Sequence, residues 1–556
     1  MTSPNSHDTD VLILGSGLAG SVAGLCLARQ GLRVVIVDQG THPRFALGES
    51  TTTPSSLWLR FLASKFDAPE LLNVASSLAV QRNVAPTSGI KDNFGFLYHV
   101  PGAARPARAW QAVLPHASFS EMSRDRDDAY SEMHYFRQDI DAYLWSSALA
   151  AGAEGRSATN TVDIDFDDDG VTVVTAKGER LRAKFVVDAS GYRSVLADKL
   201  GLRETPTRLR TNSRTLFTHM VGVGKYEDLN LVPPTMSAWS RGTLHHIFAG
   251  GWMWVIPFGN HPGSKNPLCS VGLSLDNRYS PPPKGQSPDE VWQAFLARHP
   301  SIAPQFANAR VVRPWVTTDR VQYSSVRCVG HRYWMTSHAA ATVDALYSFG
   351  NINTFQTVAC GVDLVLRAFR DGNFDPVRFE PLQRLTDNAL RFQDRIVYGN
   401  YVAMRDPRLL QVWIGLWAYT DTGRIRQILP FLVEYARTGD RRRLDACLEA
   451  PDEVLTGFGH NTGLEPTRKV LDMLDGWCDL MQDFEEGRAD ADTTLARLEA
   501  SVQSDPRFGV DLRTMGQILS ELPWRYRALR EHDLRLYAAS FLTTQEMNGL
   551  GIADPR

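Results

Sequence analysis

The chain has 556 residues, too many for one small core, and its length favours a large catalytic domain with at least one further lobe. Hydrophobic residues make up 43% and charged residues 22% of the sequence, which are ordinary values for a globular protein. The 59 basic residues almost balance the 62 acidic ones, so we expect neither a polycationic surface nor a nucleic-acid partner.

The six cysteines stand singly along the chain without a C-x-x-C pair, as is typical of reduced structural thiols. The segment Met1–Asp10 is polar and acidic, and no apolar run approaches the roughly 18 residues that a membrane-spanning helix needs. We therefore expect a soluble cytoplasmic protein with no membrane partner.

The start of the chain alternates strand and helix. A short apolar run at Val11–Leu14, a helical stretch at Leu18–Gln30 and a second apolar run at Leu32–Val37 predict a βαβ unit. Between strand and helix stands Gly15-Ser16-Gly17-Leu18-Ala19-Gly20, whose small residues let backbone N–H groups approach a pyrophosphate, and Asp38 follows where a ribose hydroxyl would lie. The residues expected to hold the dinucleotide here are Gly15, Gly17, Leu18, Ala19, Gly20, Asp38 and Gln39. A chance glycine-rich turn is the alternative, but it would not explain the strand, the helix and the acid together.

Two later segments favour FAD over NAD. Arg137, just before a predicted helix at Asp139–Ala151, can present its guanidinium to a phosphate, although a surface ion pair would explain it equally well. Phe185–Asp188 is typical of a buried strand, and the segment around it, Val186–Gly191, resembles the strand-end Asp-Ala-x-Gly of flavin monooxygenases. Asp188, Ala189 and Gly191 are therefore expected at the flavin.

Further segments resemble the successive signatures of flavin-dependent halogenases. They are Pro43–Ser50, Gly89–Phe96 and Gly251–Phe258, the last of which contains Trp252-x-Trp254-x-Ile256-Pro257. Longer matches at His134–Asp139 and Gly242–Phe248 point to the branch with the pyrrolnitrin-pathway pyrrole halogenase and the chlortetracycline halogenase. The likeness runs from about residue 10 to about residue 400 and fades beyond about residue 450.

The resemblance implies a fold and a division into domains. The fold class is an α/β (α+β) FAD-binding Rossmann-like domain of the glutathione-reductase or aromatic-hydroxylase type, with an inserted mixed β-sheet and a helical C-terminal lobe. The FAD-binding domain is expected over residues 8–380, with its nucleotide part at 8–80, 130–213 and 320–380 and the inserted substrate sheet at 81–129 and 214–319. From about residue 380 apolar residues step by three and four, which predicts a helical domain over 381–556 with helices such as Arg424–Ala436, Thr467–Phe484 and Trp524–Phe541.

The resemblance also implies a chemistry. Reduced FAD reacts with O2 to a C4a-hydroperoxide, a halide converts it to hypohalous acid, and a lysine delivers the halogen to an electron-rich phenolic or pyrrolic secondary metabolite. Lys91 matches that lysine, and Trp252 and Trp254 would form a wall between flavin and substrate. A surface lysine and two core tryptophans are the alternatives. No second dinucleotide fingerprint is found, so a separate flavin reductase is expected, and the aromatic substrate is either free or tethered to a carrier protein.

The remaining site residues come from the same resemblance. Those expected at the flavin are Arg44, Gly48, Glu49, Ser50, Asp344, Gly350 and Asn351, and those expected at the halide (chloride or bromide) or the substrate are Ser348, Phe349, Ile256, Pro257 and Phe94.

One segment, His338–Gly350, departs from the family pattern, and it leads into a helix that is predicted to begin near Asn353. Related halogenases have Phe where Thr342 stands, Pro where Ala345 stands and commonly Arg where Phe349 stands. An FAD-dependent monooxygenase or oxidase with an altered halide site is therefore the alternative function, and a flavin-binding remnant without catalysis is a third.

Other candidate features favour structural roles. His245-His246 has no partner at metal-ligand spacing, so no metal site is expected. Trp413 and Trp417 stand four residues apart on a predicted helix and could line an aromatic substrate cleft, but core packing is the favoured interpretation, and Gly457–Gly463 is predicted to be a loop.

Overall fold

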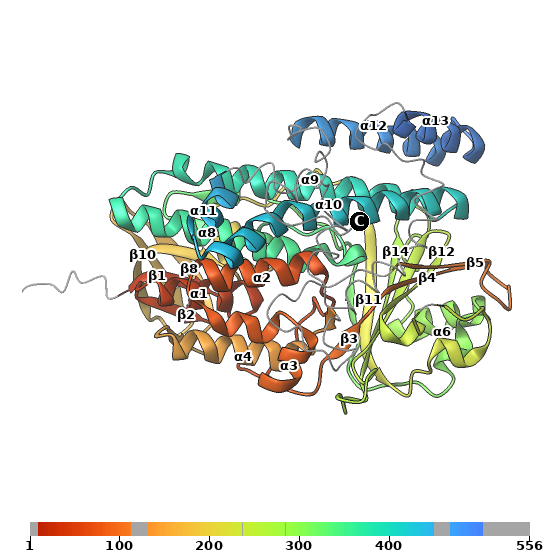
Figure 1. Cartoon of the computed structure of the whole chain (residues 1–556), viewed down its shortest axis with the longest axis horizontal. Coiled ribbons are helices and arrows are strands. Elements are labelled where there is room, and N and C mark those ends of the chain that lie inside the picture. The colour runs from red at the N-terminus through yellow and green to blue at the C-terminus, as the bar shows by residue number, and fades with distance from the viewer. Residues whose placement is uncertain (1–8, 113–131, 236, 284, 450–466, 504–556) are drawn as a thin grey trace, which may run out of the picture.

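The computed structural model describes residues 9–112, 132–449 and 467–503, apart from 236 and 284 (Figure 1). The predicted helix Trp524–Phe541 and the predicted loop Gly457–Gly463 lie outside the described residues.

A parallel sheet forms the nucleotide part, as predicted. Strand β1 (Thr9–Leu14) lies between β2 (Val34–Val37) and β10 (Arg180–Asp188) and runs parallel to both. The full order is β17-β18-β10-β1-β2-β7, completed by β7 (Glu154–Arg156), β17 (Val329–Gly330) and β18 (Tyr333–Met335), while β8 (Thr161–Phe166) and β9 (Val171–Thr175) extend β10 as an antiparallel meander. Leu14 is in register with Val37 and Asp188, so the carboxyl ends of the three central strands meet at one edge.

Helices cover this sheet. Helix α1 (Leu18–Arg29) follows β1 and packs against α4 (Arg137–Ala150) and α8 (Phe349–Asp371). The prediction that a helix begins near Asn353 was wrong by one turn, because α8 starts at Phe349. The chain enters it through a short turn, Leu346–Ser348, in which Tyr347 and Ser348 have left-handed backbones, and sequence periodicity does not predict such a turn.

The inserted sheet is mixed, as predicted. Its order is β15-β11-β14-β13-β12-β4-β5, and only the pair of β12 and β4 is parallel. The strands are β4 (Phe94–His99), β5 (Arg108–Ala112), β11 (Ser213–Val221), β12 (Thr243–Phe248), β13 (Gly251–Pro257), β14 (Cys269–Asp276), β15 (Arg310–Val311) and β16 (Val316–Thr318), and the last pairs with β11. Alternate side chains of β13 enter different cores: Trp252 and Trp254 face the nucleotide part, whereas Met253 and Val255 pack on the other face with α6 (Pro288–Arg298).

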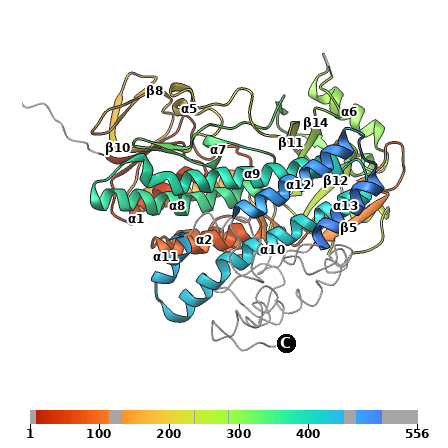
Figure 2. The ribbon, with the colours of Figure 1, turned by 90° about the horizontal axis from the view of Figure 1, so that it is seen from above.

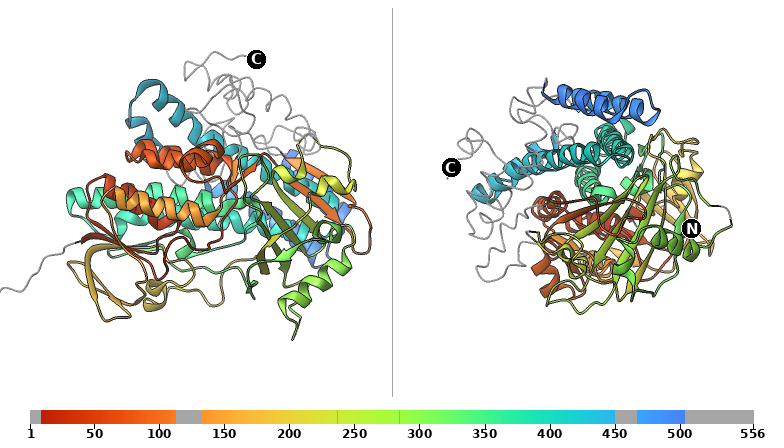
Figure 3. Two further views of the ribbon diagram at one scale, coloured as in Figure 1. Left: turned by 90° about the horizontal axis from the view of Figure 1, so that it is seen from below. Right: turned by 90° about the vertical axis from the view of Figure 1, so that its right-hand side faces the viewer.

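The helices after residue 380 pack along the helices of the earlier part of the chain (Figure 2). They are α9 (Glu380–Ala403), α10 (Pro407–Thr438), α11 (Arg442–Glu449), α12 (Thr467–Glu485) and α13 (Ala491–Gln503). Helix α10 packs against both α9 and α2 (Thr53–Lys65), and one continuous cluster of buried apolar side chains extends from Val11 to Leu498. Figure 3 shows the molecule from two more sides, and α10, coloured cyan, runs beside the segments that precede it in the chain.

The shorter helices are α3 (Ser77–Asn83), α5 (Val195–Lys199) and α7 (Ser337–Ala340), and β3 (Gly89–Lys91) and β6 (Glu132–His134) form a separate two-stranded sheet. Within the described ranges, no helix combines the length and the apolar character needed to cross a bilayer. The predicted boundary between the two domains at residue 380 stays a prediction.

Candidate functional site

A cleft of about 960 Å³ opens at the carboxyl edge of the parallel sheet. It is lined by predicted cofactor residues Gly15, Gly17, Asp38, Gln39, Arg44, Ala189 and Gly191. Leu18, Ala19 and Gly20 form the first turn of α1 beside it. The cleft therefore lies where a doubly wound sheet binds its ligand, in line with a helix N-terminus that favours negative charge.

Two glycines of this turn, Gly15 and Gly20, leave no room for a side chain. Gly15 has a left-handed backbone with φ of 97°, and a methyl group added there would lie 2.6 Å from the carbonyl oxygen of Ala189. A methyl group on Gly20 would lie 1.9 Å from the carbonyl oxygen of Gly15. The close approach of α1 to the ends of β1 and β10 thus requires these glycines, and the cradle that results fits the pyrophosphate of FAD.

Asp38 holds this turn in shape. Its Oδ2 accepts hydrogen bonds from the backbone N–H and the hydroxyl of Ser16, each at 2.7 Å, and from Nη2 of Arg44 at 2.9 Å. Burial alone would raise the pKa of Asp38, but the donors from Ser16 and the charge of Arg44 outweigh it, so the pKa lies below its ordinary value. Asp38 is therefore a carboxylate that stabilises the turn while it lines the cleft.

Asp188 has a similar role at the end of β10. It is fully buried, and it accepts hydrogen bonds from the backbone N–H of Ser190 at 2.9 Å and from the hydroxyl of Ser194 at 2.5 Å. Burial raises the pKa of this carboxyl. Asp188 fixes the turn that carries Ala189 and Gly191 into the cleft.

Arg137 does not form a surface ion pair. It is the first residue of α4, it is buried, and its Nε and Nη2 donate to the carboxylate of Asp141 at 2.7 and 2.9 Å. Its Nη1 donates to the carbonyl oxygens of Leu47 and Gly48. The guanidinium thus fixes the segment before Ser50, and a phosphate contact for it stays a prediction.

Sequence reasoning missed the residues at the opening of the cleft. Arg203 donates to Ala340 O at 3.0 Å and to Tyr192 O at 2.8 Å, and its guanidinium carbon lies 4.8 Å from the ring centroid of Tyr323. Tyr192 is 68% exposed, and its ring meets that of Tyr323 edge-on at 5.0 Å. Isolated tyrosines and an arginine carry no motif, so only the fold brings them together.

Lys91 is 3% exposed, which excludes a solvated surface lysine. Its Nζ donates to the hydroxyl of Ser50 at 2.7 Å and to the carbonyl oxygen of Thr51 at 2.8 Å, and it lies 3.5 Å from the ring centroid of Phe94. In the β3–β6 ladder Lys91 stands opposite Glu132, which the sequence did not single out. The ammonium therefore sits in a buried polar site with an aromatic wall.

The two predicted wall tryptophans lie side by side on β13, with ring centroids 5.4 Å apart. The indole N–H of Trp252 donates to the hydroxyl of Tyr401 at 3.1 Å, and that of Trp254 donates to Ser270 at 3.2 Å. Ile256 is buried on the same strand, and the carbonyl oxygen of Pro257 contacts His134. The indoles are fixed by hydrogen bonds as well as by packing.

The start of α8 is joined to the Lys91 site. The hydroxyl of Ser348 donates to that of Ser50 at 3.0 Å, and the side-chain amide of Asn351 donates to the carbonyl oxygens of Gly48 and Ser50 at 3.2 and 3.1 Å. A methyl group on Gly350 would lie 3.0 Å from the His338 ring. The sequence-distant segments 48–51 and 348–351 thus form one surface around Lys91.

Two other predicted residues serve as anchors. Asp344 is buried and accepts hydrogen bonds from Ser213 and Tyr401 at 2.8 and 2.9 Å. Glu49 accepts a hydrogen bond from Nε2 of His219 at 2.8 Å.

The departures from the family pattern fit the loop without disrupting it. Thr342 pairs through its backbone with Tyr323 in an antiparallel bridge. Ala345 has φ of −79°, a value that proline also adopts, so the backbone keeps a proline-compatible shape. Phe349 is fully buried, and the guanidinium carbon of Arg424 on α10 lies 4.5 Å from its ring centroid.

Helix α10 also brings Trp417 into this region. Its ring stacks on that of Tyr347 at 4.4 Å and meets that of Phe94 edge-on at 4.8 Å. Trp413, one turn earlier, is buried and donates to the carbonyl oxygen of Ile396 at 2.7 Å. Core packing describes Trp413 fully, whereas Trp417 is in addition one contact away from Lys91 through Phe94.

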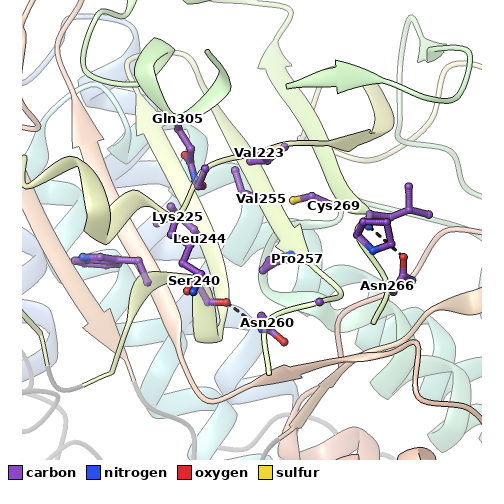
Figure 4. Close-up of a pocket in the computed structure, with 15 residues that line it drawn as sticks. Val223, Lys225, Ser240, Leu244, Val255, Pro257, Asn260, Asn266, Cys269 and Gln305 are labelled. Carbon is purple, nitrogen blue, oxygen red and sulfur yellow. Dashed lines mark hydrogen bonds between the residues drawn. The ribbon is translucent and has the colours of Figure 1, made fainter. Parts of the chain in front are cut away.

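A smaller cavity of about 140 Å³ lies on the opposite face of the inserted sheet (Figure 4). Asn260 stands at its edge and donates to the carbonyl oxygens of Ser240 and Ile90 at 2.9 and 2.7 Å. Asn260 thus connects the lining of this cavity to the strand that carries Lys91. Among the residues that the structure describes, no three His, Cys, Asp or Glu side chains gather as a metal site, and all six cysteines are free and buried.

Comparisons with known proteins agree with this geometry. Residues 8–261 match the model of an FAD binding domain. The chain is 43% identical to monodechloroaminopyrrolnitrin halogenase PrnC of Pseudomonas fluorescens, over 76% of this chain and 74% of that protein. It is 39% identical to the tetracycline 7-halogenase of Kitasatospora aureofaciens, over 80% and 78%. The crystal structure of halogenase PltM in complex with phloroglucinol and FAD superposes with a TM-score of 0.81, at 32% identity, and covers 89% of this chain and 95% of that one.

Proposed function

Because the chain belongs to the flavin-dependent halogenases, we propose that it chlorinates an electron-rich phenolic or pyrrolic metabolite and that Lys91 passes the halogen to the substrate. The observation that carries the proposal is the buried ammonium of Lys91, held by Ser50 and Thr51 beside the start of α8. The relatives of 43% and 39% identity are halogenases, which favours halogenation over the oxidase or monooxygenase alternative. FAD, O2 and a halide are the co-reactants of the family reaction.

The cofactor would be held by residues already described. The glycine turn and Asp38 would bind its adenosine half, and the segments around Ser50 and Asn351 would bind the ring end. When bound and reduced, FAD supplies with O2 the oxidising equivalent that turns a halide into an electrophile. The single dinucleotide fingerprint of the sequence supports a separate flavin reductase as the source of reduced FAD, and we place both proteins in the cytoplasm.

Lys91 can serve the reaction in two protonation states. As an ammonium it can donate a hydrogen bond to the oxygen of hypohalous acid, and as a free amine it can take up the halogen as a haloamine. The Trp252–Trp254 pair lies in the same core as Phe94, which supports its role as a wall between flavin and substrate. Backbone N–H groups of the 344–350 loop are the proposed halide ligands, since the left-handed residues Tyr347 and Ser348 give that loop a turn of the kind that binds anions.

The relatives support the substrate class. The PltM structure contains phloroglucinol, a phenol. A relative of 23% identity, which the chain covers over 82% of its length, is a 1H-pyrrole-2-carbonyl-[peptidyl-carrier protein] chlorinase. We therefore include both chloride and a carrier-tethered substrate in the proposal, alongside a free aromatic substrate.

The test needs no natural substrate. Reduced FAD and the protein are mixed with O2, with and without chloride or bromide, and active halogen is captured by a β-diketone trap. We expect a halide-dependent product that Lys91→Ala reduces by about 100-fold or more. Lys199→Ala, a change at an exposed lysine on α5, is the control and should keep the full yield. Peroxide as the sole product, at a rate indifferent to halide, would contradict the proposal.

A further inference from the structure

Lys91 stands at one end of a hydrogen-bonded chain that terminates at His134. Nζ of Lys91 donates to the hydroxyl of Ser50 at 2.7 Å, the hydroxyls of Ser50 and Thr243 lie 3.2 Å apart, and that of Thr243 lies 2.9 Å from Nε2 of His134. The other ring nitrogen, Nδ1, lies 3.0 Å from the carbonyl oxygen of Pro257. The four residues come from β3, the segment before α2, β12 and β6, so only the fold assembles the chain.

The partners fix the direction of every hydrogen bond. The carbonyl oxygen of Pro257 can only accept, so Nδ1 of His134 carries a hydrogen. Burial, and then the charge of Lys91, lower the pKa of His134 to about 3, so the ring is neutral and its Nε2 accepts from Thr243. The hydroxyl of Thr243 then accepts from Ser50, and Ser50 accepts from Lys91 and from Ser348. All hydrogens point from the ammonium toward the imidazole.

We propose that His134 accepts, through Thr243 and Ser50, the proton that Lys91 releases when it takes up halogen, and that it returns this proton after the substrate has been halogenated. The inference rests on the proposed function, in which Lys91 carries the halogen. In the first step the ammonium and hypohalous acid give the haloamine and water: two N–H bonds and the O–X bond break, an N–X bond forms, and one of the two released protons forms the new O–H bond of water. The surplus proton passes to His134. In the second step the aromatic carbon takes the halogen, its own proton goes to the amine nitrogen, and His134 returns its proton to that amine.

The surroundings of Lys91 favour this transfer. Glu132 stands opposite on β6, His245 of β12 lies close enough for the Lys91 charge to lower its pKa, and Asp92 next to Lys91 pairs with Arg241 at 2.5 Å. Glu132 already accepts hydrogen bonds from Thr51 and Ser56, at 2.7 and 2.9 Å. Movement of the proton leaves the net charge of this buried group unchanged. Burial still lowers the pKa of His134 after Lys91 has become a neutral haloamine, but the repulsion from the Lys91 charge has disappeared, so the pKa of the imidazole rises at the step in which a proton must be stored.

His134 is in this scheme a positioning and proton-storing residue, and its test uses the full chain without flavin. The protein is mixed with one equivalent of hypochlorous acid, free oxidant is removed rapidly, and the active chlorine that stays bound is titrated with iodide. The amount of Lys91 haloamine is the bound chlorine of the wild type minus the bound chlorine of Lys91→Ala. Its rate of formation is measured from about pH 6 to about pH 10, as a ratio to the wild type at each pH.

His134→Gln keeps an acceptor for Thr243 but cannot hold a proton, and Thr243→Val interrupts the chain. Near pH 6 we expect both variants to form the haloamine about 10- to 100-fold more slowly than the wild type. At the alkaline end of the pH range, where Lys91 is already a free amine, their rates should approach that of the wild type. Thr243→Ser keeps the hydroxyl and should restore the wild-type rate. Thr218→Val is the matched control, because Thr218 is also buried in the inserted sheet and its hydroxyl donates to Arg313 O at 2.6 Å.

The outcomes separate the two proposals. If the wild type and Lys91→Ala bind the same amount of chlorine, the proposed role of Lys91 is wrong, and the proton path with it. If the Lys91 haloamine forms but His134→Gln and Thr243→Val follow Thr218→Val at every pH, the path is wrong while the proposed function stands. A uniform slowing at all pH values would indicate a structural role for His134 and would also overturn the path.

Discussion

Gly20 shows at the level of single atoms why two positions of the first motif require glycine. The α-carbon of Gly20 faces the carbonyl oxygen of Gly15, and Gly15 in turn faces Ala189 at the end of β10. Three segments therefore meet with no space between their backbones. A side chain at either glycine would push α1 away from the edge at which the cleft opens.

Gly20→Ala is expected to abolish FAD binding and to lower the free energy of unfolding by about 1–3 kcal/mol, because the added methyl group overpacks a backbone contact. Gly476→Ala is the matched control: Gly476 lies in α12, and a methyl group there meets no atom within 4 Å. That change should leave FAD affinity unaltered and stabilise the helix by up to about 1 kcal/mol. Flavin fluorescence quenching measures the FAD affinity, and urea unfolding measures the free energy of unfolding. Equal affinity and equal stability of the two variants would show that the backbone contact at Gly20 is not required.

Strands β6 and β12 carry three buried histidines that are neutral in the folded protein, His134, His245 and His246. Burial lowers the pKa of His134, His245 and His246 to about 3 in each case, far below the ordinary value. In the unfolded chain these rings bind protons below about pH 6.5. Between about pH 6.5 and about pH 3 the unfolded state therefore holds more protons, and the folded state loses stability as the pH falls.

Each of these histidines should contribute a loss of up to about 1.4 kcal/mol per pH unit in that window. His246→Gln is expected to make the decline in unfolding free energy between about pH 6 and about pH 4.5 measurably shallower, because one proton-binding group is removed from the unfolded state only. His331→Gln, a change at an exposed histidine, serves as the control. Parallel pH profiles for His246→Gln and the wild type would show that this ring does not drive the acid sensitivity.

The α8 loop and α10 are coupled through Phe349 and Arg424. The ring of Phe349 and that of Phe392 enclose the guanidinium, whose carbon lies 4.5 and 4.8 Å from the two centroids. Arg424 itself is buried. The guanidinium that related halogenases commonly have at position 349 is thus replaced here by that of Arg424 on α10.

Phe349→Arg is expected to destabilise the protein by about 3 kcal/mol or more, because it buries a second guanidinium beside the first. In Phe349→Arg/Arg424→Met the like charges no longer meet, so the loss should be smaller than the sum of the single losses by about 1–3 kcal/mol. Urea unfolding of the four proteins in a double-mutant cycle measures the difference. If the free-energy losses of the two single variants add up to that of the double variant, residues 349 and 424 do not interact.

For the whole molecule, sequence patterns predicted the parts more successfully than their junctions. The βαβ start follows from short apolar runs and from glycine spacing, which are local properties, whereas the mixed inserted sheet and the pair Trp252 and Trp254 follow from the resemblance to the halogenase family. The start of α8 was misplaced because left-handed residues at Tyr347 and Ser348 leave no periodic signal. Thr243 and His134 stood inside recognised motifs, yet their link to Lys91 depends on strands that are far apart in sequence. Likewise, Arg137 meets its carboxylate inside its own helix, and nothing in the sequence distinguishes that burial from exposure.

A chain ended at residue 380 is expected to be insoluble or unable to retain FAD. Such a chain lacks α9, whose Leu382, Leu385 and Phe392 are buried in the shared core, and it lacks Trp417, which stacks on Tyr347. Tyr98 would also lose its hydrogen bond to the carbonyl oxygen of Met404, at 2.9 Å. Soluble yield and bound flavin per chain, compared with the full-length protein, measure the effect. A soluble, flavin-loaded fragment would instead support an independent domain boundary at that residue.

Neighbouring strands of the parallel sheet come from distant parts of the chain, and this order affects how the protein folds during synthesis. Strand β1 pairs with β10, which follows more than a hundred residues later, β10 pairs with β18, and the turn after β18 leads to Ser348 and Asn351 beside Lys91. On the ribosome, the first fifty residues therefore emerge with their glycine motif but without the neighbours that shape it. Flavin capture must therefore wait until α8 has left the exit tunnel, and until then the apolar strands β1 and β2 lack β10 and the helix that completes the site.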